Sequence, residues 1–206
     1  MALHENPQQH IGLRLPTRRR SNAAVPVTSE SVTTTSAAAY AFAATRVLLG
    51  FVFLWAFFDK AFGWGYATPA AKSWVNGGSP TKGFLSGVSA GPMESTFHSW
   101  AGNGLVDWLF MLGLLGIGAA MIAGVAVRIA AASGILMVAF MWLATYPLAQ
   151  HTSTGAPTSS TNPFVDEHVM DAFALLAVAA FGTASSLGLG AMWARLPLVK
   201  RHRALL

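Results

Sequence analysis

The chain has 206 residues, of which 53% are hydrophobic and only 10% are charged, and it contains no cysteine. Soluble domains carry about 25% charged residues, so this composition excludes a disordered protein and argues against a soluble globule. The absence of thiols excludes thiol-disulfide catalysis, thiolate zinc sites and iron–sulfur clusters. The net charge of +5 lies mostly at the two ends of the chain. No basic groove accompanies it, and nucleic acid is therefore not an expected partner.

The chain divides into three parts by composition. Residues 1–36 are polar, contain several Pro, Ser and Thr, and show no apolar periodicity, which predicts a disordered tail. Residues 37–196 hold every long apolar stretch and form the predicted transmembrane domain. Residues 197–206 carry a cluster of Lys and Arg and form a predicted basic tail.

Four apolar blocks are long enough to cross about 30 Å of hydrocarbon as helices. They cover residues 40–58, 108–127, 129–149 and 172–194. The first block contains Arg46 near its N-terminal end, where a long side chain reaches the membrane interface. The sequence predicts an all-α integral membrane protein, an up-down four-helix transmembrane bundle with a long first extracytoplasmic loop. The lipid bilayer is its expected partner.

Basic residues predict the orientation of these spans. Of 13 Lys and Arg, only Lys60, Lys72 and Lys82 fall on the side of the two long loops, residues 63–103 and 150–166, which leaves ten on the other side. The positive-inside rule places both termini in the cytoplasm of a multi-pass protein of the plasma (inner) membrane.

The first long loop is expected to have structure of its own, since it has about forty residues and connections are usually much shorter. After Pro92, the residues Met93, Phe97 and Trp100 fall at helical spacing and predict a short interfacial helix. The loop tryptophans are more typical of interfacial anchors than of an aromatic ligand pocket.

Small residues repeat every four positions on two of the predicted spans. Such rows let helices approach closely in lipid, and they predict that the second span packs on the fourth. The rows are Gly116, Ala120 and Gly124 on the second span, and Ala180, Ala184 and Gly188 on the fourth.

Ionisable residues gather where the spans meet the two long loops. His168 and Asp171 are three residues apart, so they share a helix face and are candidates for a hydrogen-bonded catalytic pair. Asp59 and Lys60 interrupt the apolar run at the end of the first span and are equally open to a structural or a functional role. The acidic residues that open the second and fourth spans are explained as helix caps. These are Asp107, Asp166 and Glu167.

No metal, haem or flavin motif is visible. No histidine lies in the first three spans, which argues against a haem held by histidines from two helices.

Three segments resemble the DoxX/DoxD family of small four-helix membrane proteins over roughly residues 40 to 200. They are Arg46-Val47-Leu48-Leu49-Gly50 leading to Phe58-Asp59-Lys60-Ala61-Phe62-Gly63, the run Gly78-Ser79-Pro80-Thr81-Lys82-Gly83-Phe84-Leu85, and Asn162-Pro163-Phe164-Val165-Asp166-Glu167-His168. The last two resemble the branch that forms the large subunit of thiosulfate:quinone oxidoreductase. This resemblance implies oxidation of thiosulfate to tetrathionate with reduction of a membrane quinone, together with a small second subunit.

In this interpretation Lys60, Lys82 and Arg46 bind the anionic substrate. His168, oriented by Asp171, handles the proton, with Asp59 nearby. Long-range electrostatics oppose a dianion, since six acidic residues and three lysines give the loop side a net charge of −3. The alternative is a non-catalytic membrane scaffold or accessory subunit that docks redox or respiratory proteins, and a small-solute carrier is a third. Whether the chain is an enzyme, a thiosulfate dehydrogenase (quinone) subunit, and whether it forms a homo-oligomer, stay open.

Overall fold

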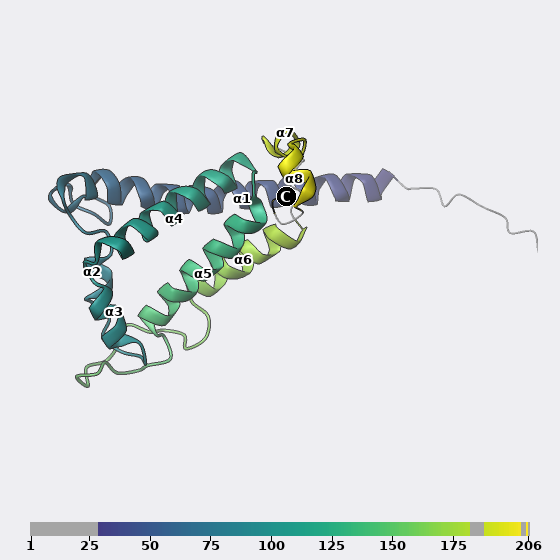
Figure 1. Ribbon diagram of the computed structural model, residues 1–206. Coiled ribbons are helices and arrows are strands. Elements are labelled where there is room, and N and C mark those ends of the chain that lie inside the picture. Colours follow the sequence, from purple (N-terminus) through teal and green to yellow (C-terminus); the bar gives the residue numbers. More distant parts are fainter. Residues whose placement is uncertain (1–28, 182–187, 203–204, 206) are drawn as a thin grey trace, which may run out of the picture.

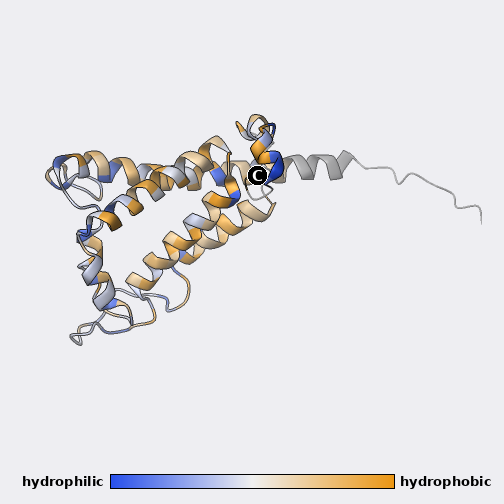
Figure 2. Ribbon diagram, in the orientation of Figure 1, coloured by the Kyte–Doolittle hydropathy of each residue, from blue (hydrophilic) through white to orange (hydrophobic). Residues whose placement is uncertain are grey.

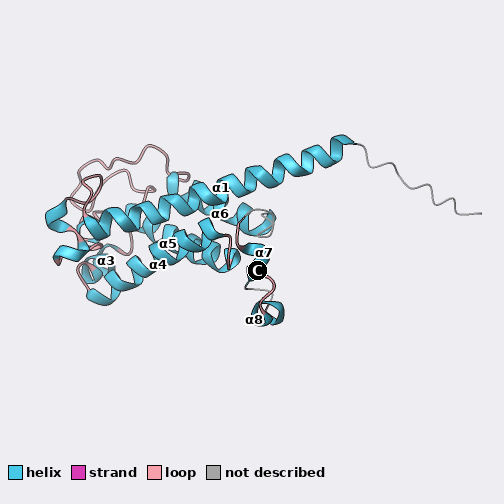
Figure 3. Cartoon of the chain, turned by 90° about the horizontal axis from the view of Figure 1, so that it is seen from above, coloured by secondary structure: helices cyan, strands magenta, loops and turns pink. Residues whose placement is uncertain are grey.

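The computed structural model describes residues 29–181, 188–202 and 205, and in this part of the chain all regular structure is helical (Figure 3). The all-α prediction is confirmed for these residues. The elements are α1 (Ser29–Phe62), the short 3-10 turns η1 (Ala70–Lys72) and η2 (Trp74–Asn76), α2 (Lys82–Leu85), α3 (Glu94–Trp100), α4 (Gly104–Ala123), α5 (Val127–Thr145), α6 (Glu167–Phe181), α7 (Gly190–Trp193) and α8 (Pro197–Arg201).

Three of these helices are long and apolar enough to cross a membrane, which indicates a membrane protein. They are Ala37–Phe62 within α1, Gly104–Ala123 and Val127–Thr145. They correspond to the first three predicted spans. Figure 2 shows apolar residues over most of α4, α5 and α6, with hydrophilic residues concentrated in the connections. Large apolar side chains on the outside of these helices, such as Leu109, Leu136 and Phe173, are exposed and suit contact with lipid.

The first helix is longer than the sequence predicts. It begins at Ser29, so residues 29–36 are helical although the sequence assigns them to a disordered tail; residues 1–28 lie outside the described part. The run Ala37-Ala38-Ala39 explains the extension, because alanine has the highest helix propensity and a formed helix propagates at low cost. With 34 residues α1 is about 50 Å long and projects beyond the other helices at its N-terminal end (Figures 1 and 3).

The fourth predicted span is described only in part, since residues 182–187 lie outside the described residues. Within the range 172–194, the prediction of one continuous helix is wrong at its C-terminal end. Gly188 has a φ of +117°, which ends any α-helix, and the short α7 begins only at Gly190. The predicted basic tail is likewise partly ordered, as α8, in which Val199 is buried.

The four long helices form a ring in which α1 packs against α4 and α6, and α5 packs against the same two helices. The predicted packing of the second span on the fourth is therefore not the main contact of either helix. At its last residue α4 meets the described chain after α6, because the backbone N–H of Leu189 donates to the carbonyl of Ala123. Ala184, the middle of the predicted row, lies outside the described residues.

The helices α1 and α4 approach each other closely at two glycines. A Cβ atom added at Gly118 would lie 2.7 Å from the backbone nitrogen of Leu54 and 2.9 Å from the carbonyl oxygen of Gly50. A Cβ added at Gly50 would lie 3.0 Å from the carbonyl oxygen of Gly118. The two backbones touch here because neither residue has a side chain, which gives the dispersion contacts that hold helices together in lipid.

The core of the ring is a single apolar cluster drawn from all four long helices. Phe53 of α1, Gly134 of α5 and Leu175 of α6 meet at its middle. The buried members are Leu49, Phe53, Ala61, Met111, Leu114, Ile117, Met121, Val127, Ala130, Ala131, Val138, Leu175 and Val178.

The pair α1–α4 and the pair α5–α6 diverge toward one end of the bundle, which we call the loop end because residues 63–103 and 146–166 lie there (Figure 1). Residues 82–101, here called the wedge, contain α2 and α3 and bridge the start of α4 and the end of α5. Leu85, Val88 and Phe97 of the wedge are buried against Ala144 of α5. The short helix predicted around Phe97 is confirmed as α3, and it has a packing role.

The second long loop rests on the wedge. The backbone N–H of Ser153 donates to the carbonyl of Ser89 at 2.7 Å, and its hydroxyl donates to the Glu94 carboxylate at 3.0 Å. Within the wedge, the Nε2 atom of His98 is hydrogen-bonded to the carbonyl of Val88 at 2.7 Å. Both long loops thus form one connected layer over the loop end.

The glycine contact predicts opposite effects for two neighbouring substitutions on α4. Gly118→Ala should lower the free energy of unfolding by about 1–3 kcal/mol, because its Cβ meets backbone atoms that cannot move aside. Gly116→Ala is the matched control, since no atom lies within 4 Å of its added Cβ, and it should be neutral or slightly stabilising. Thermal unfolding in detergent measures both, and equal melting temperatures for the two variants would contradict the contact.

Candidate functional site: an apolar groove with an oriented histidine

Two of the carboxylates at the loop end hold the chain in place. Asp59 is almost completely buried and accepts hydrogen bonds from the backbone N–H groups of Tyr66 (3.2 Å) and Ala67 (3.1 Å). These bonds fix the segment that leaves α1. The sequence prediction that Asp59 is catalytic stays a prediction, and the bonds found here give the residue a structural role.

Asp107 fixes the next segment of the same loop. One of its carboxylate oxygens accepts from the Ser79 hydroxyl (2.9 Å), the Thr81 hydroxyl (2.6 Å) and the Thr81 backbone N–H (3.1 Å). The cap of α4 is Asn103, whose side chain accepts from two backbone N–H groups of the first turn. Asp107 is thus a tertiary anchor rather than the simple helix cap that the sequence suggests.

The third carboxylate, Asp166, positions His168. Its Oδ2 atom lies 2.8 Å from Nδ1 of the histidine ring, while its Oδ1 atom accepts from the backbone N–H of Val169 at 3.1 Å. The sequence predicted Asp171 as the partner of the ring. Asp166 is the partner instead because it lies directly before α6. From there one carboxylate reaches both a backbone N–H of the first helical turn and the side chain of His168. Asp171 is half-buried one turn further along α6.

These bonds set the charge and the proton positions of the pair. Burial raises the pKa of Asp166, but the hydrogen bonds from His168 and from the Val169 backbone outweigh it, and the pKa lies below its ordinary value. An ionised carboxylate only accepts hydrogen bonds, so Nδ1 of His168 carries a hydrogen. In the neutral ring Nε2 is then the free acceptor, and in the charged ring it becomes a donor.

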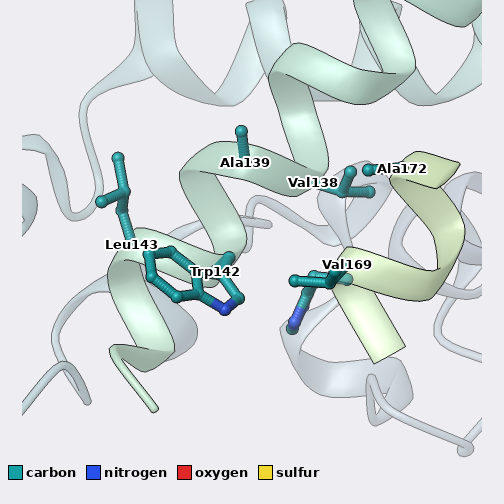
Figure 4. A pocket seen from close by; sticks show the side chains of 7 residues that line it. Val138, Ala139, Trp142, Leu143, Val169 and Ala172 are labelled. Carbon is teal, nitrogen blue, oxygen red and sulfur yellow. The ribbon is translucent and has the colours of Figure 1, made fainter. Parts of the chain in front are cut away.

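A groove of about 350 Å³ lies between α5 and α6 next to this histidine (Figure 4). Its lining residues are Val138, Ala139, Trp142, Leu143, His168, Val169 and Ala172. The two helices are close at Gly134, where an added Cβ would lie 2.9 Å from Leu175, and the groove opens two turns further on, where α5 carries the bulky Trp142. Trp142 and His168 are the two lining residues whose side chains carry polar atoms.

The indole of Trp142 projects from α5 into the groove toward α6 (Figure 4). Its Nε1 atom is buried and has no hydrogen-bond partner among the described residues. The sequence alone does not distinguish this residue, because it lies within an apolar span. The signal was present: a tryptophan N–H away from water needs an acceptor, and an apolar span offers none except its own helix carbonyls.

A small acidic cluster adjoins the groove. One ligand atom from each of Asp166, Glu167 and His168 lies within 4.8 Å of the others, so these residues could hold a cation. A cation that used Nδ1 of the ring would have to replace the bond between His168 and Asp166. The sequence predicted no metal site.

The three predicted substrate-binding cations do not line the groove. Lys82 is exposed on α2, and Lys60 is half-buried in the last turn of α1. In Figure 1 this end of α1 and the start of α6 belong to the two diverging helix pairs. Arg46 is buried at the other end of the bundle, beside Gly124 and Gly188. The described structure therefore gathers an apolar groove and a histidine but no cluster of cations, and the anion-binding roles stay predictions.

No protein family model matches this chain, and neither a curated protein nor a solved structure is detectably similar to it.

The bond between Asp166 and His168 predicts a pH-dependent stability. Because the folded-state pKa of Asp166 lies below its ordinary value of 3.8, its contribution is present above that pH and is lost as the pH falls through the lower value. At pH 7, Asp166→Asn should reduce the unfolding free energy by about 1–3 kcal/mol, and this difference should shrink below pH 4. Melting temperatures at several pH values measure it, with the exposed neighbour Glu167→Gln as control. A difference that is independent of pH would contradict the ionised pair.

Proposed function

We propose that this protein is the membrane subunit of a quinone-linked oxidoreductase, similar to thiosulfate:quinone oxidoreductase. The observation that carries the proposal is the apolar groove between α5 and α6 with His168 in its wall and Asp166 behind the ring. A quinone headgroup is flat, largely apolar and soluble in the bilayer, and its oxygens need polar groups at a few defined points. Ligand sites of this kind are apolar pockets with few, well-placed polar atoms.

His168 supplies the proton chemistry in this proposal. Quinone reduction takes up two electrons and two protons, and oxidation of two thiosulfate ions to one tetrathionate releases two electrons. Nε2 of His168 donates a proton to a quinone oxygen and is then reprotonated from the aqueous side. Asp166 stabilises the charged ring and fixes its direction, as the carboxylate partner of a catalytic histidine does.

The sulfur half of the reaction rests on the resemblance to the DoxX/DoxD family. Lys60 and Lys82 would bind thiosulfate by local charge, since the loop side is acidic overall. We assign this half-reaction to an assembly with the small second subunit that the resemblance implies. Because neither lysine lines the groove, the sulfur site and the quinone site are separate in this proposal.

The proposed topology has four spans, with α6 as the start of the fourth and both termini in the cytoplasm of the cell membrane. It is supported by the ten Lys and Arg on the side of the termini against three on the loop side. The loop end then faces outward. The groove opens in the outer half of the bilayer, close to the aqueous boundary from which a proton reaches His168.

Bound quinone tests the proposal directly. Protein purified in detergent should release quinone on solvent extraction, and His168→Ala should lower thiosulfate-dependent quinone reduction by about 10²-fold or more. His151→Ala is the control, because this histidine is exposed on the second long loop. Purified wild-type protein that carries no quinone but retains a tightly bound redox partner would favour the non-catalytic scaffold instead.

Single cysteines test the topology, because the natural chain has no thiol. In intact cells a membrane-impermeant maleimide should label Ser159→Cys, which lies on the second long loop, and should leave Ser21→Cys unlabelled. Both positions should react after the membrane is permeabilised. Labelling of Ser21→Cys in intact cells would overturn the orientation.

A further inference from the structure

Trp142 has a polar atom for which the described part of the chain provides no partner. The Nε1 atom is buried without a hydrogen bond among the described residues, and burial of an unpaired donor opposes folding. Phenylalanine would fill the same apolar space without this cost. The N–H group is therefore expected to have an acceptor that does not belong to the described chain.

The surroundings of the indole restrict what this acceptor is. The other lining side chains are aliphatic except for His168, and the carbonyl groups of α5 in the turns before Trp142 are used within the helix. The groove is the space into which the ring projects (Figure 4). The Nε1 atom is covered by protein atoms, so a molecule in the groove that carries an acceptor oxygen completes the missing bond once the indole turns toward it.

We propose that Trp142 is a positioning residue that donates its indole N–H to one oxygen of the groove ligand, and that it selects the oxidised form of that ligand. The inference rests on the proposed quinone function. An indole N–H only donates, and a carbonyl oxygen is a better acceptor than a hydroxyl group on an aromatic ring. Trp142 therefore favours binding of the quinone over binding of the quinol, while His168 donates the proton in the same groove.

Binding of two soluble analogues to the purified protein measures this selection. Trp142→Phe should raise the Kd of decylubiquinone by about 3- to 10-fold, as expected for one lost hydrogen bond, and should change the Kd of decylubiquinol much less. The melting temperature without ligand should stay the same or rise. Trp108→Phe is the matched control, because this exposed tryptophan on α4 packs against Trp74 and does not line the groove.

A measurement on the wild-type protein covers the case in which the variant does not fold. In protein labelled with ¹⁵N-tryptophan, one of seven indole N–H resonances should move downfield on addition of decylubiquinone. It should not do so with decylbenzene, which has the same tail and no oxygen.

The outcomes separate the two proposals. Failure of wild-type protein to bind decylubiquinone would overturn the proposed function and this inference with it. Normal binding of both analogues by Trp142→Phe, or equal losses for quinone and quinol, would overturn only the role of Trp142. The absence of any downfield indole shift in a protein that binds decylubiquinone would do the same.

Discussion

A carboxylate at the edge of an apolar bundle must be hydrogen-bonded, because burying an unpaired charge opposes folding strongly. This constraint organises the whole loop end. Asp59 accepts hydrogen bonds from two backbone N–H groups, and Asp107 accepts them from the hydroxyl groups of Ser79 and Thr81. Asp166 accepts one from a backbone N–H and is hydrogen-bonded to the ring of His168. Each carboxylate accepts its hydrogen bonds from a different segment of the chain and thereby fixes that segment in place. The first two thereby hold the start of the long loop against the helices, and the third aims an imidazole at the groove.

The groove itself follows from how α5 and α6 are paired. The two helices approach closely where Gly134 contacts Leu175. They are farther apart at the level of Trp142, whose indole is bulky. A helix pair with a small residue at one level and a large one two turns away leaves a space that is open at the side. When that space is lined by aliphatic residues, its chemistry is decided by the few polar atoms in its wall, here those of Trp142 and His168. This concentration of polar function in two residues makes the site sensitive to single substitutions.

The sequence predicted those features that depend on composition and local spacing. Apolar length predicted four spans, of which three correspond to helices long enough to cross a membrane, and the positions of Met93, Phe97 and Trp100 predicted α3. The sequence did not predict features that depend on which faces meet in three dimensions. The row at Gly116 did not predict the close contact of α4 with α1, which Gly118 makes. Likewise helical spacing favoured Asp171 as the partner of His168, whereas the residue before the helix reaches the ring. The sequence did not predict a role for Trp142, because a single N–H donor does not stand out within a run of apolar residues.

The wedge has a consequence for the order of assembly during synthesis. Its buried residues Leu85, Val88 and Phe97 precede α5 in the chain, yet they are covered by Leu143 and Ala144 near the end of that helix. The wedge therefore cannot complete its core while the ribosome has delivered only α1 and α4. During that interval its apolar side chains must rest in the membrane interface or be shielded by a chaperone. Insertion of α5 is thus the step that lets the wedge complete its core, and the second long loop and α6, which brings the histidine, follow it in the chain.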